Sequence, residues 1–268
     1  MRNAAHESIQ NDTFLNKNAN DIAVSIKNIN KVYKSNKGSD VNALNDINLN
    51  INKGEFLSII GPSGCGKSTL LRILANLDVS TTGEIIWSED SGNTIGYVFQ
   101  DSTLLPWKNV YDNARFPLQI KKLETPENLK KLDDLLELSG LSSFKKAYPY
   151  ELSGGMKQRV SIVRALSYNP DVLLMDEPFG ALDAMTRDKM NLELLRIWSE
   201  TKKTIVFITH SISEAAFLSD RVVVMSPRPG KIDHVFNINI PRPRGVEVRE
   251  TLEFVNYVKN LREVLGND

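Results

Sequence analysis

The sequence predicts an α/β fold in which a mostly parallel sheet carries an inserted helical lobe. Short apolar runs typical of buried strands lie at residues 56–60, 95–99, 172–175, 204–208 and 222–225. Helical segments separate several of these runs, and such alternation is typical of a parallel sheet covered by helices. From about residue 101 to 159 the strand pattern stops and leucines recur at helical spacing. This stretch is the predicted helical lobe.

Local patterns justify the elements in chain order. Ile47, Leu49 and Ile51 alternate with asparagines, which predicts a half-buried strand. The strand at 56–60 runs into a glycine-rich turn, and a helix is expected from Lys67 to Asn76. Another helix, from about 183 to 201, is expected between the strands at 172–175 and 204–208.

Two further helices are expected later in the chain. Ser153 can cap a helix that ends at Asn169-Pro170. Its apolar face would hold Met156, Val160, Val163 and Leu166. A last helix is expected after the proline-rich stretch 241–245, with one apolar face packed on the preceding domain. That face would comprise Val248, Leu252, Val255, Val258, Leu261 and Leu265.

Composition excludes several classes of function. Lys plus Arg equals Asp plus Glu, 33 of each, so no bulk attraction to nucleic acid or anionic lipid is expected. Cys65 is the only cysteine, which rules out an internal disulfide and favours a reducing compartment. No apolar stretch approaches the roughly 20 residues of a membrane span. Residues 1–20 are polar, lack the apolar centre of a secretory signal, and are expected to form a disordered tail. A membrane role would therefore need a partner.

The segment from Gly61 to Ser68 reads Gly-Pro-Ser-Gly-Cys-Gly-Lys-Ser, the pattern of a phosphate-binding loop. Its glycines let several backbone N–H groups point at one phosphate, next to the positive end of a helix. Lys67 would reach the β- and γ-phosphates, and the Ser68 hydroxyl would hold Mg²⁺. A chance glycine-rich turn is the alternative, and the strand before it and helix after it argue against that.

An apolar strand ending in Asp176 and Glu177 supplies two carboxylates. Asp176 would bind Mg²⁺, and Glu177 would polarise the water that attacks the nucleotide. Taken alone, the segment is equally typical of a buried strand with an acidic end. Behind a phosphate-binding loop, it indicates hydrolysis of a nucleoside triphosphate.

The segment Leu-Ser-Gly-Gly-Met at 152–156 places a second glycine-rich turn at a helix N-terminus. Such a terminus can bind an anion. Because the first loop already cradles the phosphates of one nucleotide, two anion sites in one chain suggest that each nucleotide is held between two copies. A capped amphipathic helix with no ligand is the alternative.

From about Ile22 to Ile240, the order and spacing of these motifs resemble the ABC-transporter ATPases. Leu-Ser-Gly-Gly resembles the signature of that family, although this chain has Met156 where the signature usually has Gln. Gln100, Asp183 and His210 resemble its Q-loop, D-loop and switch residues. Tyr33 resembles the aromatic residue that stacks on adenine. Each of these four would be unremarkable alone.

The resemblance implies a P-loop NTPase core with an antiparallel β subdomain and ATP and Mg²⁺ as cofactors. It implies an ATPase domain over 21–240 and a C-terminal helical extension over 241–268. The implied catalytic residues are Glu177, His210, Gln100 and Lys67, and the implied metal ligands are Ser68, Gln100 and Asp176. The implied nucleotide-binding residues are Tyr33, Gly61, Pro62, Ser63, Gly64, Cys65, Gly66, Lys67, Ser68, Thr69, Ser153, Gly154, Gly155 and Asp183.

Finer features resemble the ATPases of nitrate, sulfonate and taurine importers. They are the segment 98–107, the sequence Leu-Ser-Gly-Gly-Met and Ser-Pro-Arg-Pro-Gly at 226–230. The resemblance implies a second copy, membrane-spanning permease subunits and an extracytoplasmic solute-binding protein as partners, no nucleic acid, and a peripheral location on the cytoplasmic face of the membrane. An exporter ATPase with separate membrane chains stays open as an alternative, as does a soluble ABC-type ATPase outside transport.

Overall fold

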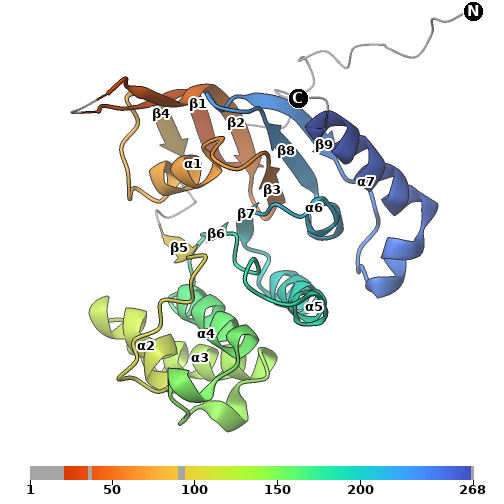
Figure 1. The fold of residues 1–268 in the computed structure, drawn as a ribbon. Helices are drawn as coiled ribbons and strands as arrows, with labels where there is room; N and C mark the ends of the chain where they lie inside the picture. Colours follow the sequence, from red (N-terminus) through yellow and green to blue (C-terminus); the bar gives the residue numbers. More distant parts are fainter. Residues whose placement is uncertain (1–20, 36–37, 90–93, 267–268) are drawn as a thin grey trace, which may run out of the picture.

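The computed structural model describes residues 21–35, 38–89 and 94–266 (Figure 1). The predicted disordered tail, residues 1–20, lies outside the described residues. Among the described residues, no helix combines the length and the apolar character that a membrane crossing needs.

A six-stranded sheet in the order β5-β6-β7-β3-β8-β9 forms the centre of the molecule. All neighbours pair in parallel except β8 and β9, which are antiparallel. This confirms the predicted mostly parallel sheet. The strands are β3 (Phe56–Ile60), β5 (Ile95–Val98), β6 (Val172–Asp176), β7 (Thr204–Ile208), β8 (Arg221–Met225) and β9 (Ile232–Asn237).

The two faces of this sheet are covered differently. Every residue of β3, β6 and β7 is buried, as expected for parallel strands with both faces covered. On one face, Phe56 and Phe207 belong to a cluster that includes residues of α5 (Ala184–Thr201) and α6 (Ile212–Leu218). On the other face, Leu57 and Ile59 share a cluster with α1 (Lys67–Leu74) and with a second sheet. Helix α1 ends two residues before the expected Asn76, whose φ is +56°.

The second sheet is antiparallel, with strand order β2-β1-β4. Its strands are β1 (Ile22–Tyr33), β2 (Val41–Asn52) and β4 (Thr82–Trp87). The alternation at 47–51 reproduces the expected burial, because Ile47, Leu49 and Ile51 are buried. This sheet confirms the antiparallel part of the predicted fold class and lies at the top of Figure 1, above α1.

The helical lobe hangs below the sheets in Figure 1. It consists of α2 (Val110–Ile120), α3 (Pro126–Leu138), the short 3-10 turns η2 (Ser142–Phe144) and η3 (Pro149–Glu151), and the start of α4 (Gly154–Leu166). The boundary expected at residue 159 falls inside α4. Val160 and Val163 pack in the lobe core, whereas Ile162 and Leu166 pack under the central sheet. One rigid helix therefore connects the lobe to the sheet.

The chain ends in the 3-10 turn η4 (Val246–Glu250) and α7 (Leu252–Leu265), which packs on α6. Buried Arg244 fixes this extension, since its guanidinium donates to the carbonyl oxygens of Phe217 at 2.9 Å and Ser219 at 2.8 Å, at the end of α6. The expected apolar face was partly wrong. Leu252 is 83 % exposed and Val255 50 % exposed.

The face of α7 that packs inward is rotated from the expected one. Phe254 and Leu261 are buried, and Tyr257, Val258, Val264 and Leu265 pack against the same core. Val248 packs there too, but from η4 and not from the helix. Apolar residues on α7 recur every three or four positions along two overlapping rows, one with Leu252 and one with Phe254. Contact with α6 and the sheet buries the row that contains Phe254.

Candidate nucleotide-binding site

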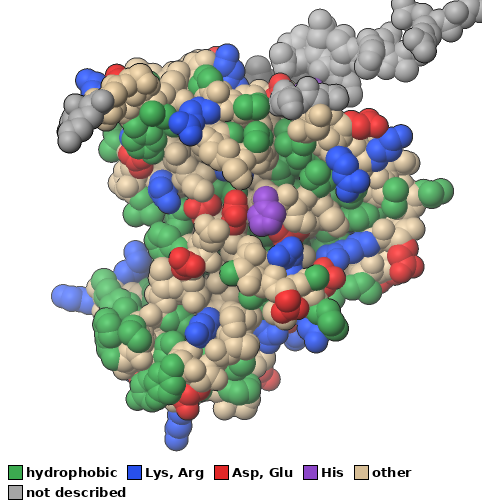
Figure 2. Space-filling model, in the orientation of Figure 1, with side chains coloured by type: hydrophobic (Ala, Val, Ile, Leu, Met, Phe, Trp, Pro, Cys, Tyr) green, Lys and Arg blue, Asp and Glu red, His purple; other side chains and the backbone are tan. Residues whose placement is uncertain are grey.

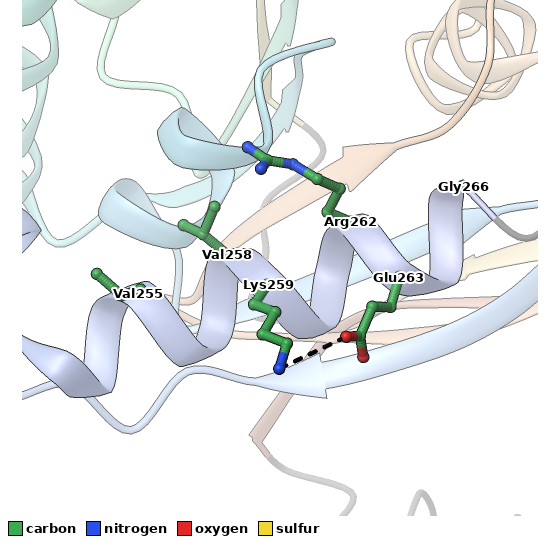
Figure 3. Close-up of a pocket in the computed structure, with 6 residues that line it drawn as sticks. All are labelled: Val255, Val258, Lys259, Arg262, Glu263 and Gly266. Carbon is green, nitrogen blue, oxygen red and sulfur yellow. Dashed lines mark ion pairs between the residues drawn. The ribbon is translucent and has the colours of Figure 1, made fainter.

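A cavity of about 320 Å³ lies where β3 and β6 end, at the carboxyl edge of the parallel strands. Ligands commonly bind at this edge in α/β proteins. The cavity is lined by Tyr33, Val41, Ala43, Ser63, Gly64, Gly66, Lys67, Ser68, Thr69, Glu177 and Arg228. A second cavity, of about 520 Å³, lies on α7, and Figure 3 shows its lining side chains on that single helix. It contains none of the predicted site residues, so the first cavity is the candidate site.

The phosphate-binding loop reverses the chain between β3 and α1. Gly66 precedes α1 with φ at +106°, which L side chains rarely adopt. A Cβ there would lie 2.6 Å from the Leu44 side chain and 2.8 Å from the Ala43 carbonyl oxygen. Only glycine fits this position, and the loop is therefore pressed against β2.

Lys67 and Ser68 begin α1 and point in two different directions. The buried Lys67 Nζ donates to the carbonyl oxygens of Gly61 at 2.8 Å and Pro62 at 3.0 Å, so its ammonium lies within the loop. The Ser68 hydroxyl donates to Asp176 Oδ1 at 2.8 Å. The ammonium of Lys67 and the hydroxyl–carboxylate pair of Ser68 and Asp176 therefore lie side by side at the start of α1.

Asp176 is buried and is held on both carboxylate oxygens. Its Oδ2 accepts from the Tyr97 hydroxyl at 3.3 Å, opposite the bond from Ser68. Burial, and then the neighbouring carboxylate of Asp176, raise the pKa of Tyr97 well above its ordinary value. Tyr97 therefore stays a proton donor that orients Asp176.

Glu177 follows directly and turns out of the sheet. Its φ of +45° is unusual for a residue with a side chain, and its N–H donates to the Ile208 carbonyl oxygen at 3.0 Å. Its carboxylate lines the cavity, with Oε2 3.4 Å from His210 Nδ1. Strained backbone of this kind is common at functional sites. Figure 2 shows a histidine side chain beside acidic side chains near the centre of this face.

Tyr33 lies at the end of β1 on the rim of the cavity, 39 % exposed. Its hydroxyl donates to Asp78 Oδ2 at 2.7 Å, and the Lys31 ammonium lies 4.6 Å from its ring centroid. The hydrogen bond from Lys31 is the main cause that lowers the pKa of Asp78. These contacts fix the position of the Tyr33 ring beside Thr69, whose Oγ1 is 3.4 Å from the Tyr33 hydroxyl.

Ser153, Gly154 and Gly155 begin α4 away from the residues that line the cavity. The Ser153 hydroxyl accepts from the Met156 N–H at 3.3 Å, so the expected cap is present. Ser153 and Gly154 are exposed. A Cβ on Gly155 would lie 2.9 Å from Thr186 Cγ2, which puts this helix start against the start of α5.

Comparison with known proteins identifies the family. The family model described as ABC transporter matches residues 44–180. The chain belongs to this family. It is 43 % identical to a taurine import ATP-binding protein of Pelagibacter ubique, over 89 % of this chain and 92 % of the relative. It is 46 % identical to an aliphatic sulfonates import ATP-binding protein of Bacillus cereus, over 84 % and 89 %.

A solved structure gives the same assignment. It is a dimeric post-hydrolysis state of an ATP-binding cassette bound to ADP and Pi, with a TM-score of 0.69 and 35 % identity, covering 81 % of this chain and all of that one. The ABC transporter family hydrolyses ATP for transport, so the chain is an ATPase with the predicted P-loop NTPase fold.

Within this ABC ATPase, the expected site residues fall into three groups. Those that line the cavity are Tyr33, Ser63, Gly64, Gly66, Lys67, Ser68, Thr69 and Glu177. Asp176 and His210 adjoin them through the contacts with Ser68 and Glu177. Not in the lining are Gly61, Pro62, Cys65, Gln100, Ser153, Gly154, Gly155 and Asp183.

Gln100 and Asp183 occupy exposed positions outside that cavity. Gln100 follows β5 by two residues, and Val98 pairs with Met175, so both strands leave the sheet at the edge that carries the site. The Asp183 carboxylate caps α5 by accepting from the Thr186 N–H at 3.0 Å, and this bond lowers the pKa of Asp183. Its contacts within the chain are those of a helix cap.

The ABC site also contains residues that were not predicted from the sequence. Tyr97 orients Asp176, and Asp78 orients Tyr33. Val41, Ala43 and Arg228 line the cavity. The first four stand in ordinary strand or turn patterns that carry no signal of function. Arg228 lies in the Ser-Pro-Arg-Pro-Gly segment, which the sequence singled out without assigning it a role.

Proposed function

We propose that this chain is the ATP-hydrolysing subunit of an ABC importer for a small solute of the nitrate, sulfonate or taurine type. The convergence of Lys67, Ser68 and Glu177 on one cavity carries the proposal for the nucleotide. Relatives at 43 % and 46 % identity that are named for taurine and aliphatic sulfonate import support the solute class. The solute itself would be recognised by other subunits.

Nucleotide binding would use the loop from Gly61 to Thr69. Backbone N–H groups and Lys67 would neutralise the β- and γ-phosphates, and the exposed ring of Tyr33 would stack on adenine. Ser68 and Asp176 present hard oxygen ligands joined by a 2.8 Å bond, the donor set that Mg²⁺ uses together with substrate phosphates. When bound, Mg²⁺ neutralises charge that develops on the phosphates.

Hydrolysis would depend on Glu177, which lies in the cavity with His210 as its neighbour. Glu177 would accept a hydrogen bond from the attacking water and orient it in line with the γ-phosphate. His210 and Gln100 would position the γ-phosphate, the water and the metal. The His210 ring, 56 % exposed, has the freedom to turn from Glu177 towards a phosphate.

A second copy would complete the site. Ser153 and Gly155 of one copy would bind the γ-phosphate held by the other, with Asp183 and Gly154 at the same interface. Loss of the bridging γ-phosphate would let the copies separate. The dimer would act on membrane-spanning permease subunits from the cytoplasmic face, and a solute-binding protein outside would deliver the substrate.

An uptake assay in a strain deleted for this chain tests the proposal. Uptake of radiolabelled taurine, an alkanesulfonate or nitrate should be lost for at least one solute and restored by the wild-type chain. Glu177→Gln should not restore it. The matched control is Lys259→Gln, a change on the exposed face of α7, which should restore uptake fully. Wild-type uptake of all three solutes in the deletion strain would refute the solute class.

A further inference from the structure

Arg228 is a second cation on the wall of the nucleotide cavity. The charged residues of the lining are Lys67, Arg228 and Glu177. Lys67 is buried within its loop, whereas Arg228 is exposed and comes from the turn between β8 and β9. A nucleoside triphosphate is a polyanion, so a second cation in the lining would add to the charge that Lys67 and a bound Mg²⁺ supply.

The turn that carries Arg228 is attached to the phosphate-binding loop. The Ser226 N–H donates to the Lys231 carbonyl oxygen at 3.0 Å, which closes the turn. The Gly230 N–H donates to the Ala43 carbonyl oxygen at 3.0 Å, which fixes the turn to β2. A Cβ on Gly230 would lie 2.0 Å from the Cys65 carbonyl oxygen, so the two loops are in direct backbone contact. Arg228 is therefore placed by packing at the cavity.

Most N–H donors of the Arg228 guanidinium have no protein acceptor among the described residues. Among the described residues its one hydrogen-bond partner is the Gly64 carbonyl oxygen, 3.4 Å from Nε, which is longer than an ordinary bond of this type. Arginine carries five N–H donors in a planar fork that matches the oxygens of a phosphate. The other N–H groups are thus available at the lip of the loop whose amides hold the phosphate chain.

We propose that Arg228 is a nucleotide-binding residue that contacts the phosphate chain of ATP and ADP from the Gly64 side of the phosphate-binding loop. This inference rests on the proposed nucleotide site and adds a residue to it. The Ser-Pro-Arg-Pro-Gly turn thereby becomes a further phosphate-binding element, brought to the phosphate-binding loop of the same chain by the pairing of β8 with β3.

Calorimetric titration on the Glu177→Gln chain, which should bind ATP without turning it over, tests this. Arg228→Ala should raise the Kd for both ATP and ADP about tenfold, as expected for loss of a charged hydrogen bond. Arg228→Lys should recover part of that affinity. Lys231→Ala removes a positive charge from the same turn but outside the cavity lining, and should leave Kd within about twofold of the parent.

Three further measurements separate the outcomes. Lys67→Ala should weaken ATP binding in the same assay; if the parent chain binds no ATP at all, the nucleotide site itself is wrong. Inorganic tripolyphosphate, which has no base, should also bind more weakly to Arg228→Ala, and unchanged affinity for it would refute a phosphate contact. Normal ATP affinity of Arg228→Ala with a lost ATP-dependent dimer would place Arg228 on the partner copy and overturn the proposal.

Discussion

The two glycine-rich helix starts of this chain, at α1 and at α4, differ in the charged groups around them, in their exposure and in their position relative to the nucleotide cavity. The start of α1 lies beside a buried lysine, a serine bonded to Asp176 and the carboxylate of Glu177, and it faces a cavity. The start of α4 is capped by its own Ser153, has Ser153 and Gly154 exposed, and does not contribute to the lining of the nucleotide cavity.

This difference teaches how the chemistry is divided. In the proposed mechanism, the cation Lys67, the proposed metal ligands Ser68 and Asp176, and the carboxylate of Glu177 all lie at the start of α1, so one chain would hold the reacting groups. The start of α4 offers only N–H groups and a hydroxyl, which can close on an anion without adding charge. Helix α4 also runs from the lobe core into the core under the sheet, so under the proposal an anion bound at its start would be linked to the lobe through one continuous helix.

The largest expected effect lies in the first region. Glu177→Gln should lower ATP turnover by about 10²–10⁴-fold, the usual contribution of a general base, with Kd for ATP unchanged. Turnover is measured by phosphate release from the assembled transporter. Glu137→Gln, an exposed neutralisation on α3, is the control. Turnover of Glu177→Gln within threefold of wild type would show that Glu177 does not activate the attacking water.

A smaller effect separates the second region from an ordinary capped helix. Ser153→Ala and Thr125→Ala each remove the N-cap of a helix and should each cost about 1 kcal/mol of unfolding free energy in urea. Ser153→Ala should also lower turnover about tenfold, through the lost bond to a phosphate. Thr125→Ala, on α3, should not. If both variants lost the same stability and kept normal turnover, Ser153 would serve only as a helix cap and would not bind a phosphate.

The same division shows what a sequence can predict. The positions of Lys67 and Ser68 follow from the loop itself, and Asp176 follows from the end of a buried strand, because these are local constraints. Arg228 lies 164 residues from Gly64 along the chain, and only the sheet order brings the two together. The bond from Tyr97 to Asp176 depends on the pairing of β5 with β6 in the same way.

The errors also have physical causes. A spacing of three and four fits two rows on α7, and tertiary contact chose the row with Phe254 over the one with Leu252. The lobe boundary near 159 was a separate expectation, drawn from scarce strand signals and helical patterns, and it lies within the continuous helix α4. Because residues of α4 pack in both the lobe core and the core under the sheet, the apolar spacing of this helix does not show where the lobe ends.

The central claim is that α4 of one copy completes the site of another. Size-exclusion chromatography with light scattering on Glu177→Gln tests it most directly. The account predicts a dimer with ATP and a monomer with ADP, which lacks the bridging γ-phosphate, and a monomer for Glu177→Gln with Ser153→Arg even when ATP is bound. A dimer that forms without ATP, or that survives Ser153→Arg, would contradict the account.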